Sequence, residues 1–282
     1  MSSSTDKKNN TTFWDKRRNT FKTHKGGWVI GEAVYNHGYS MMDELVGEKS
    51  FFQVLLLNIT GKLPEKKLTD WLEASFICLS WPDPRIWCNQ IGSLAGTART
   101  SPVAAVSMGI LASDSRLYGP GTLLAATEFI INAGKEAQSG KTVPNIVNNE
   151  LARKALISSA RPVVVGYARP LAKGDERVTA MERVGRQLGF DIGMHLQLAY
   201  DIHGHLVKHH DEGINLAGYC AAFLADQNFT AKEINRIFST WVHSGVHACY
   251  AEAKDRPADS FLPQRCDDIK YTGPQSRQLP KE

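Results

Sequence analysis

The chain has 282 residues, of which 42% are hydrophobic and 22% are charged. This length is enough for one large domain or two small ones, and it can bury a sizeable apolar core. No apolar run reaches the roughly 18–20 residues of a membrane span, and the N-terminus lacks the apolar core of a secretory signal, so we expect a cytoplasmic protein without a membrane partner.

The net charge of +4 is concentrated at the N-terminus. Residues 1–25 carry seven Lys and Arg against two Asp, which gives +5, so the remaining residues sum to about −1. A basic, Ser- and Asn-rich arm of this kind is typical of a solvated, disordered segment, although Phe13, Trp14 and Phe21 could dock it onto the body. No nucleic-acid motif accompanies the charges, so a nucleic-acid partner is not expected.

The cysteines show no pattern of a redox pair or a zinc finger. There are five, at positions 78, 88, 220, 249 and 266, without C-x-x-C spacing. An odd number within apolar helical patterns indicates reduced, buried thiols, since free Cys usually behaves as a small hydrophobe. We therefore predict no metal site and no permanently bound cofactor.

Apolar periodicity predicts a protein built almost entirely from helices. Residues 28–35 are the only strand-like stretch, which predicts a small ribbon that ends at His37-Gly38. Helices are expected, in chain order, over residues 50–59, 64–79, 103–112, 123–133, 145–160, 176–189, 192–207 and 230–253. The helix over 50–59 is apolar nearly all round, so we expect it to be buried on every side. The pattern indicates an all-α fold without internal repeats.

Capping residues define several of these helix ends. Ser101-Pro102 predicts an N-cap followed by a first-turn proline for the helix over 103–112. Gly134 is expected to end the helix over 123–133. Thr230 and Glu233 form a capping box, which opens a last helix of some twenty residues.

Five short segments occur in an order that can be compared with a known family. They are residues 47–64, 97–121, 165–177, 215–226 and 271–274. The first looks like a buried helix followed by a TGxLP turn, and the second like a helix that delivers an LHGG loop. The third looks like GFGHP…GDPR one residue short, the fourth like NVDGxSAALLLD, and the last like YxGP. Together they resemble the citrate synthase superfamily, particularly its short citryl-CoA lyase-like branch, over roughly residues 28–274.

This resemblance implies an architecture and a substrate class. It implies two helical domains, a larger one of residues 26–121 and 233–282 and a smaller one of residues 122–232, preceded by the basic arm of residues 1–25. A homodimer, or a heteromer with a paralogue, is expected on the same ground. The resemblance also implies a CoA thioester as substrate, with a keto acid or a citrate-like acid as the second ligand.

The same resemblance places altered residues at the family's catalytic positions. Where the family carries His, His and Asp, this chain carries Tyr118, Arg169 and Ala217. The family's reaction makes or breaks a carbon–carbon bond beside a thioester, with a base at the acyl carbon and donors at the two carbonyls. Tyr118 can donate a hydrogen bond to an enolate, or it merely fills the old pocket. Arg169 could bind a substrate carboxylate or a CoA phosphate, or pair with Asp175 or Glu176.

Ala217 is the most damaging replacement, because a methyl group cannot take a proton. Another carboxylate or an imidazole would have to replace it. One candidate is Asp83, in the loop where the family carries a DH pair, and the other is Asp211, in the polar turn of residues 209–212. The alternative is that this turn is only a solvated surface. Shifting the alignment of Arg169 by one or two residues restores no His at that position.

Three glycines mark tight turns where the backbone approaches closely, at Gly119, Gly121 and Gly166. By resemblance, these positions and Arg177 are candidates for binding the CoA thioester. Two functions are compatible with the whole pattern. The first is a divergent enzyme that forms or cleaves a carbon–carbon bond of an acyl-CoA with altered active-site residues. The second is a catalytically inactive relative that serves as a ligand-binding, regulatory or structural subunit.

Overall fold

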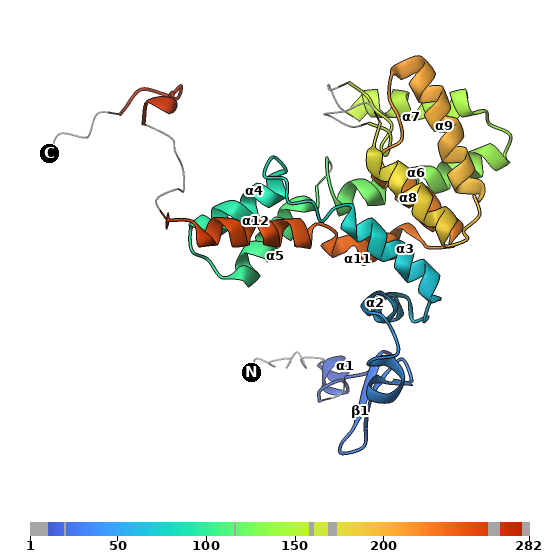
Figure 1. Ribbon diagram of the computed structural model, residues 1–282, viewed down its shortest axis with the longest axis vertical. Coiled ribbons are helices and arrows are strands. Elements are labelled where there is room, and N and C mark those ends of the chain that lie inside the picture. The colour runs from blue at the N-terminus through green and yellow to red at the C-terminus, as the bar shows by residue number, and fades with distance from the viewer. Residues whose placement is uncertain are drawn as a thin grey trace, which may run out of the picture. The chain divides into compact units, whose positions relative to one another are not determined.

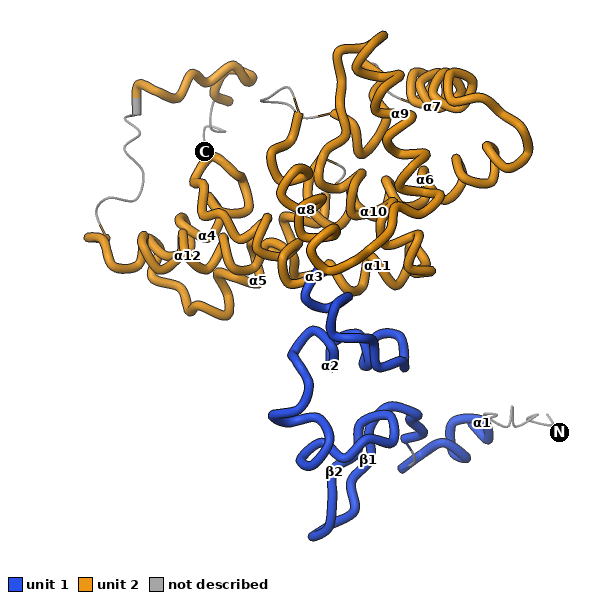
Figure 2. The backbone as a smooth tube through the Cα atoms, turned by 45° about the vertical axis from the view of Figure 1, so that its right-hand side comes forward, with its two compact units in different colours: residues 1–72 blue, residues 73–282 orange. Residues whose placement is uncertain are grey.

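The computed structural model describes residues 11–19, 21–115, 117–157, 161–168, 174–258 and 266–277. Its chain divides into two compact units, residues 1–72 and 73–282 (Figure 2). The described residues are mostly helical, which confirms the predicted all-α fold, and no helix among them is both long and apolar enough to cross a bilayer. The domain boundaries expected from the sequence stay a prediction.

The first unit contains the predicted ribbon as a three-stranded antiparallel sheet. Strands β1 (Gly26–Val29), β2 (Ala33–Asn36) and β3 (Tyr39–Ser40) pair in that order. The strand-like stretch of residues 28–35 is two strands rather than one, because Gly31 takes a left-handed φ of 80° in the turn between them. A short helix α1 (Thr12–Asp15) precedes the sheet, and a π-helical turn η1 (Met41–Leu45) follows it.

Helix α2 (Phe51–Thr60) has the predicted ends but not the predicted burial. Ser50 and Gln53 form a capping box, and Gly61 ends the helix with a φ of 78°. Only the face with Gln53, Leu56 and Leu57 is buried, whereas Phe51 is 75% exposed. The prediction that this helix is buried on every side is therefore wrong for a single copy of the chain. Helix α3 (Lys66–Ile77) follows and crosses the boundary between the units.

The second unit contains the other long helices (Figure 1). In chain order they are α4 (Trp87–Thr97), α5 (Pro102–Ser113), α6 (Pro120–Gln138), α7 (Val143–Ile157), α8 (Glu176–Gln187), α9 (Met194–His210), α10 (Leu216–Asp226), α11 (Ala231–Ile237) and α12 (His243–Asp255). Helix α12 packs along α4 and α5, while α10 packs against α6, α8 and α9. Each of these two groups of helices is thus held together by contacts between helices that lie far apart in the sequence.

Two expected helix ends differ from the structure. Helix α6 continues to Gln138, because Gly134 does not end it but lies against the His195 ring, where a Cβ would come within 3.1 Å. The single helix expected over 230–253 is broken by a 3₁₀ turn η2 (Phe238–Thr240) between α11 and α12. The break buries Trp241, whose indole N–H donates to the Ser75 carbonyl at 2.8 Å.

Asp226 caps the start of α9, which predicts how stability depends on pH. Its carboxylate accepts the His195 and Leu196 backbone N–H groups at 2.8 and 2.9 Å and contacts the His195 ring nitrogen Nδ1 at 3.0 Å. Burial acts to raise the pKa of Asp226, but these hydrogen bonds outweigh burial and lower it below its ordinary value. The charged carboxylate therefore contributes stability at neutral pH, and this contribution is lost as pH falls below about 4.

We expect Asp226→Asn to lower the free energy of unfolding at pH 7 by about 1–3 kcal/mol. The Asn side chain has only one acceptor oxygen for the two backbone N–H groups at the start of α9. The loss should shrink as the pH falls through the lowered pKa of the native carboxyl, because the carboxyl then becomes protonated in the wild type as well. Urea denaturation of both proteins over a series of pH values from 7 downward measures this difference. Asp201→Asn, on an exposed position of the same helix, is the control and should change little. Equal losses at all of these pH values would contradict the assignment.

Candidate functional site

Two of the five segments singled out in the sequence, residues 165–177 and 215–226, touch through their backbones. The Asn215 N–H donates to the Gly166 carbonyl at 2.9 Å, and the Asn215 side-chain amide donates to the Ala168 carbonyl at 2.8 Å. A Cβ on Gly218 would lie 2.2 Å from the Gly166 carbonyl oxygen. Asn215 also caps α10 by accepting the Gly218 N–H. This contact fixes the start of α10, where Ala217 is half-buried.

Asp175 joins the start of α8 to the start of α10. Its side chain is fully buried and accepts hydrogen bonds from Arg177 Nε and Nη2, both at 2.7 Å, and from the Leu216 N–H at 2.9 Å. Burial acts to lower the pKa of Arg177, but Asp175 more than offsets this and raises it. Arg177 is therefore a fixed cation beside the helix that carries Ala217, with its side chain 23% exposed.

Tyr118 lies in the loop between α5 and α6 and acts electrostatically on Arg177. The Ser115 hydroxyl oxygen accepts the Tyr118 N–H at 3.1 Å, and the Tyr118 ring meets the Trp87 ring edge-on at 5.2 Å. Burial raises the pKa of Tyr118 to about 12, and Cys88 adds to this, while Arg177 opposes it. The phenol is thus neutral at physiological pH and can only donate its proton in a hydrogen bond or accept through its lone pairs.

The glycines at the start of α6 are required by close packing. A Cβ on Gly119, whose φ is 71°, would lie 2.3 Å from the Ser113 carbonyl oxygen. A Cβ on Gly121 would lie 2.5 Å from the Ser115 carbonyl oxygen. These contacts account for both residues as parts of the tight turn that positions Tyr118, and their contact with a ligand stays a prediction.

The remaining candidates are placed elsewhere or not described. Arg169 lies outside the described residues. Asp83 is buried in the loop before α4, where hydrogen bonds from Arg85 hold its carboxylate and lower its pKa. None of the hydrogen bonds found for Asp83 in the described chain reaches Tyr118 or the start of α10. Asp211 is exposed in the turn that ends α9, with a φ of 55°. Their roles as bases stay predictions.

The described thiols are held in their protonated form. Burial raises the pKa of Cys78, Cys88, Cys220 and Cys249, that of Cys88 to about 11. All four are free cysteines. Within the described ranges, no group of three or more His, Cys, Asp or Glu residues is arranged to hold a metal ion.

Sequence reasoning missed the role of Asp175. It considered this residue only as a partner for Arg169, although Asp175 stands two positions before Arg177 in the GDER motif. That spacing is a usable signal, because an N-cap Asp commonly binds the first N–H groups of its helix. Trp87, which contacts Tyr118, carried no signal beyond its aromatic character.

Comparisons with known proteins agree with this architecture. No protein-family model and no curated protein matches the sequence. Citryl-CoA lyase from Hydrogenobacter thermophilus superposes with a TM-score of 0.75 at 24% identity, over 92% of this chain and 97% of that one. A mutant ATP citrate lyase from Methanosaeta concilii, in complex with (3S)-citryl-CoA, gives 0.72 at 18% identity, over 97% of this chain and 45% of that one.

Citrate synthase from Thermotoga maritima is also similar, with a TM-score of 0.59 at 16% identity, over 81% of this chain and 59% of that one. The chain thus spans nearly all of the citryl-CoA lyase but about half of the two larger proteins. The resemblance read from the five sequence segments is confirmed at the level of the fold. The chain has a citrate synthase-like fold of the citryl-CoA lyase-like type.

Proposed function

We propose that this protein acts on an acyl-CoA thioester of a citrate-like acid and cleaves or forms the carbon–carbon bond beside the thioester. The observation that carries the proposal is a partly buried, charged Arg177, which Asp175 holds beside the start of α10 and which acts electrostatically on a neutral Tyr118. The similar proteins named above, a citryl-CoA lyase and an enzyme in complex with citryl-CoA, support the substrate class.

Arg177 would bind a carboxylate of the acid. Its Nε and Nη2 are occupied by Asp175, whereas Nη1 has no acceptor among the described residues. A guanidinium with one free edge forms strong, directional hydrogen bonds to a carboxylate. Asp175 would act as a positioning residue, because it holds the guanidinium in one orientation and contacts no substrate itself.

Tyr118 would donate a hydrogen bond to the thioester oxygen as negative charge develops there. Its raised pKa keeps the proton on the phenol at neutral pH. A fixed donor of this kind, aimed at a forming oxyanion, is worth on the order of 10²–10³ in rate.

Cleavage and synthesis are the two directions of one step, so the same groups serve both. In cleavage, the tertiary hydroxyl passes its proton to water, the carbon–carbon bond breaks to leave a ketone, and the bond's electron pair forms a thioester enolate that then takes a proton from water at carbon. The Asp175 carboxylate is occupied by at least four hydrogen bonds, and Ala217 offers only a methyl group, so solvent water would carry both protons. Tyr118 would stabilise the enolate by donating a hydrogen bond to its oxygen.

We expect Tyr118→Phe to lower kcat for citryl-CoA cleavage by about 100-fold while KM changes little, because the lost hydrogen bond forms mainly in the transition state. Release of acetyl-CoA from citryl-CoA measures this. Tyr35→Phe, at an exposed tyrosine of strand β2, is the control and should behave as the wild type. Absence of cleavage, together with no deuterium uptake from heavy water into a panel of acyl-CoA thioesters, would overturn an enzymatic function.

A catalytically inactive, ligand-binding subunit is the second candidate. It is favoured by the methyl group at Ala217, which cannot accept a proton, and by the hydrogen bonds, at least four, that already occupy the Asp175 carboxylate. Calorimetric titration with CoA, citrate and oxaloacetate separates the two functions. Binding without turnover supports this second candidate, and failure to bind any of the three contradicts both.

The outer face of α4 and α5 supports the expected homodimer. From residue 87 to residue 113 the only charged residue is Arg99, whose guanidinium donates to the Lys254 and Arg256 carbonyls. Large apolar side chains are exposed on both helices, namely Trp87, Leu94, Val103, Met108 and Leu111. A face without charges can meet a second copy of itself without repulsion, as a two-fold interface requires.

We expect Leu111→Arg to convert a dimer to a monomer, because the interface would then bury two unpaired cations. Light scattering at several protein concentrations measures the mass. Leu156→Arg is the matched control, since Leu156 is 88% exposed on α7 and lies outside this face. A wild type that is monomeric, or a Leu111→Arg variant that stays dimeric, would contradict this interface.

A further inference from the structure

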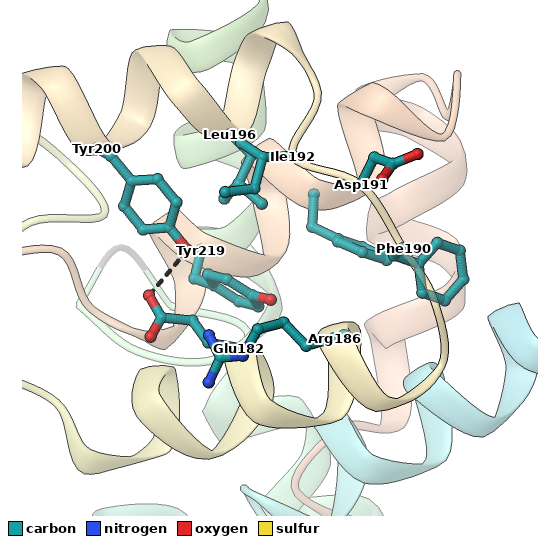
Figure 3. Close-up of a pocket in the computed structure, with 10 residues that line it drawn as sticks. Glu182, Arg186, Phe190, Asp191, Ile192, Leu196, Tyr200 and Tyr219 are labelled. Atoms are coloured by element: carbon teal, nitrogen blue, oxygen red, sulfur yellow. Dashed lines mark hydrogen bonds between the residues drawn. The ribbon is translucent and has the colours of Figure 1, made fainter.

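A small hollow of about 60 Å³ lies between α8, α9 and α10 and opens to solvent (Figure 3). Its apolar lining comes from Phe190, Ile192 and Leu196, and from Tyr219 and Phe223 of α10. Its lining is mostly apolar with a few charged and polar groups that can fix orientation, as in small-molecule sites. The hollow is separate from the Tyr118 and Arg177 region, because its lining includes neither residue.

Two opposite charges line the same edge of this hollow. Glu182 and Arg186 are four residues apart on α8 and therefore share a face of the helix. The Tyr200 hydroxyl donates to Glu182 at 2.8 Å, which orients the carboxylate. Burial raises the pKa of Tyr200 and Glu182 adds to this, while Arg186 opposes it, so both charges act on the same hydroxyl. Neither Glu182 nor Arg186 has an ion-pair partner within the described part of the chain.

We propose that this hollow binds an α-amino acid with an apolar side chain. The ligand's ammonium group would bind Glu182, and its carboxylate would bind the fork of Arg186. An α-amino acid carries these two charges on one carbon, which matches two neighbouring charges on a single helix turn. Its side chain would lie against Phe190, Ile192 and Leu196. The site is independent of the proposed thioester function.

Ligands that carry only one charge would pair with only one of the two charged side chains. A carboxylic acid of the same shape would leave Glu182 without a cation, and an amine would leave Arg186 without an anion. Asp191 lies on the opposite side of the hollow from Glu182 (Figure 3), so it does not replace Glu182 as the group that binds ammonium. The chemistry therefore favours a zwitterion over either single charge.

The test is calorimetric titration of the full chain with L-leucine, 4-methyl-2-oxopentanoate and 3-methylbutylamine, which share one carbon skeleton. Leucine should bind at least about tenfold more tightly than either analogue, because each analogue loses one charge-assisted contact. Arg186→Gln and Glu182→Gln should each weaken leucine binding by a similar factor. Arg183→Gln, at an exposed arginine of α8 outside the hollow, should leave it unchanged.

A space-filling variant separates binding in the hollow from binding elsewhere. A Cβ on Gly185 would meet only the Tyr219 hydroxyl at 3.4 Å, an ordinary contact, so Gly185→Leu can fill the hollow from α8. This variant should keep the wild-type circular dichroism and lose leucine binding. The proposal is overturned if leucine, methionine and phenylalanine produce no binding heat up to about 10 mM, a range that covers weak sites. It is also overturned if the analogues bind equally well or if Arg186→Gln binds as the wild type does.

Discussion

Arg177→Gln should abolish most of the binding of citrate or citryl-CoA, with a loss of about 100-fold or more. The guanidinium is the cation that the proposed site offers to a substrate carboxylate, and removal of one partner from such a pair typically costs 2–5 kcal/mol. The same substitution should lower the free energy of unfolding by about 3–5 kcal/mol, because it leaves the buried Asp175 carboxylate without its cation. Calorimetry and urea denaturation measure the two effects.

A double variant separates these two losses. Adding Asp175→Asn to Arg177→Gln removes the stranded charge and should restore part of the stability, but it cannot restore ligand binding. Arg183→Gln, at an exposed arginine on the same helix, should change neither quantity. If the double variant regains binding, or if Arg177→Gln binds citrate as the wild type does, Arg177 is not the carboxylate site. If Arg177→Gln lowers the stability but leaves ligand binding unchanged, the role of Arg177 is only structural.

Local signals predicted most helix starts correctly, because they act within a single turn. The Ser50–Gln53 capping box and the Thr230–Glu233 capping box both form as expected. Ser101 likewise accepts the Ala104 N–H at the start of α5. Each of these hydrogen bonds joins residues only three positions apart, so the amino-acid pattern contains everything that is needed.

The same amino-acid pattern could not predict contacts between residues that are distant in sequence. Gly134 follows the last apolar position of the predicted helix, where glycine often forms a cap. Instead, the His195 ring requires the space that glycine leaves inside α6. The break before α12 arises from the burial of Trp241 against the Ser75 carbonyl, 166 residues away in sequence. Neither His195 nor Ser75 is near its partner in sequence, so no local rule could have identified these contacts.

The sequence predicted which segments form the candidate site, but it did not predict the contacts between them. The motif order placed residues 166–170 and 215–218 in one site, and the structure brings residues 166–168 and 215–218 into direct contact. Asp175 was not predicted as the link between helices, because its bond to the Leu216 N–H spans 41 residues and exists only in the fold. The catalytic roles of Tyr118, Arg169 and Ala217 stay predictions.

Gly218→Ala should be the most destabilising small substitution in the second unit, since its Cβ would lie 2.2 Å from the Gly166 carbonyl oxygen. That carbonyl is backbone and accepts the Asn215 N–H, so it cannot move without breaking the contact between the two segments. Overpacking of this kind typically costs 1–3 kcal/mol, and we expect at least about 3 kcal/mol here because both sides are backbone.

The matched control is Gly204→Ala, the same substitution in the interior of α9, where nothing lies within 4 Å of the added Cβ. It should stabilise the protein by about 0.5–1 kcal/mol, because alanine loses less conformational entropy than glycine in a helix. Two identical changes of one methyl group should therefore shift the urea midpoint in opposite directions. A Gly218→Ala variant as stable as the wild type would mean that the backbones of residues 166 and 218 do not meet as described. The backbone contact that positions the proposed site would then be absent.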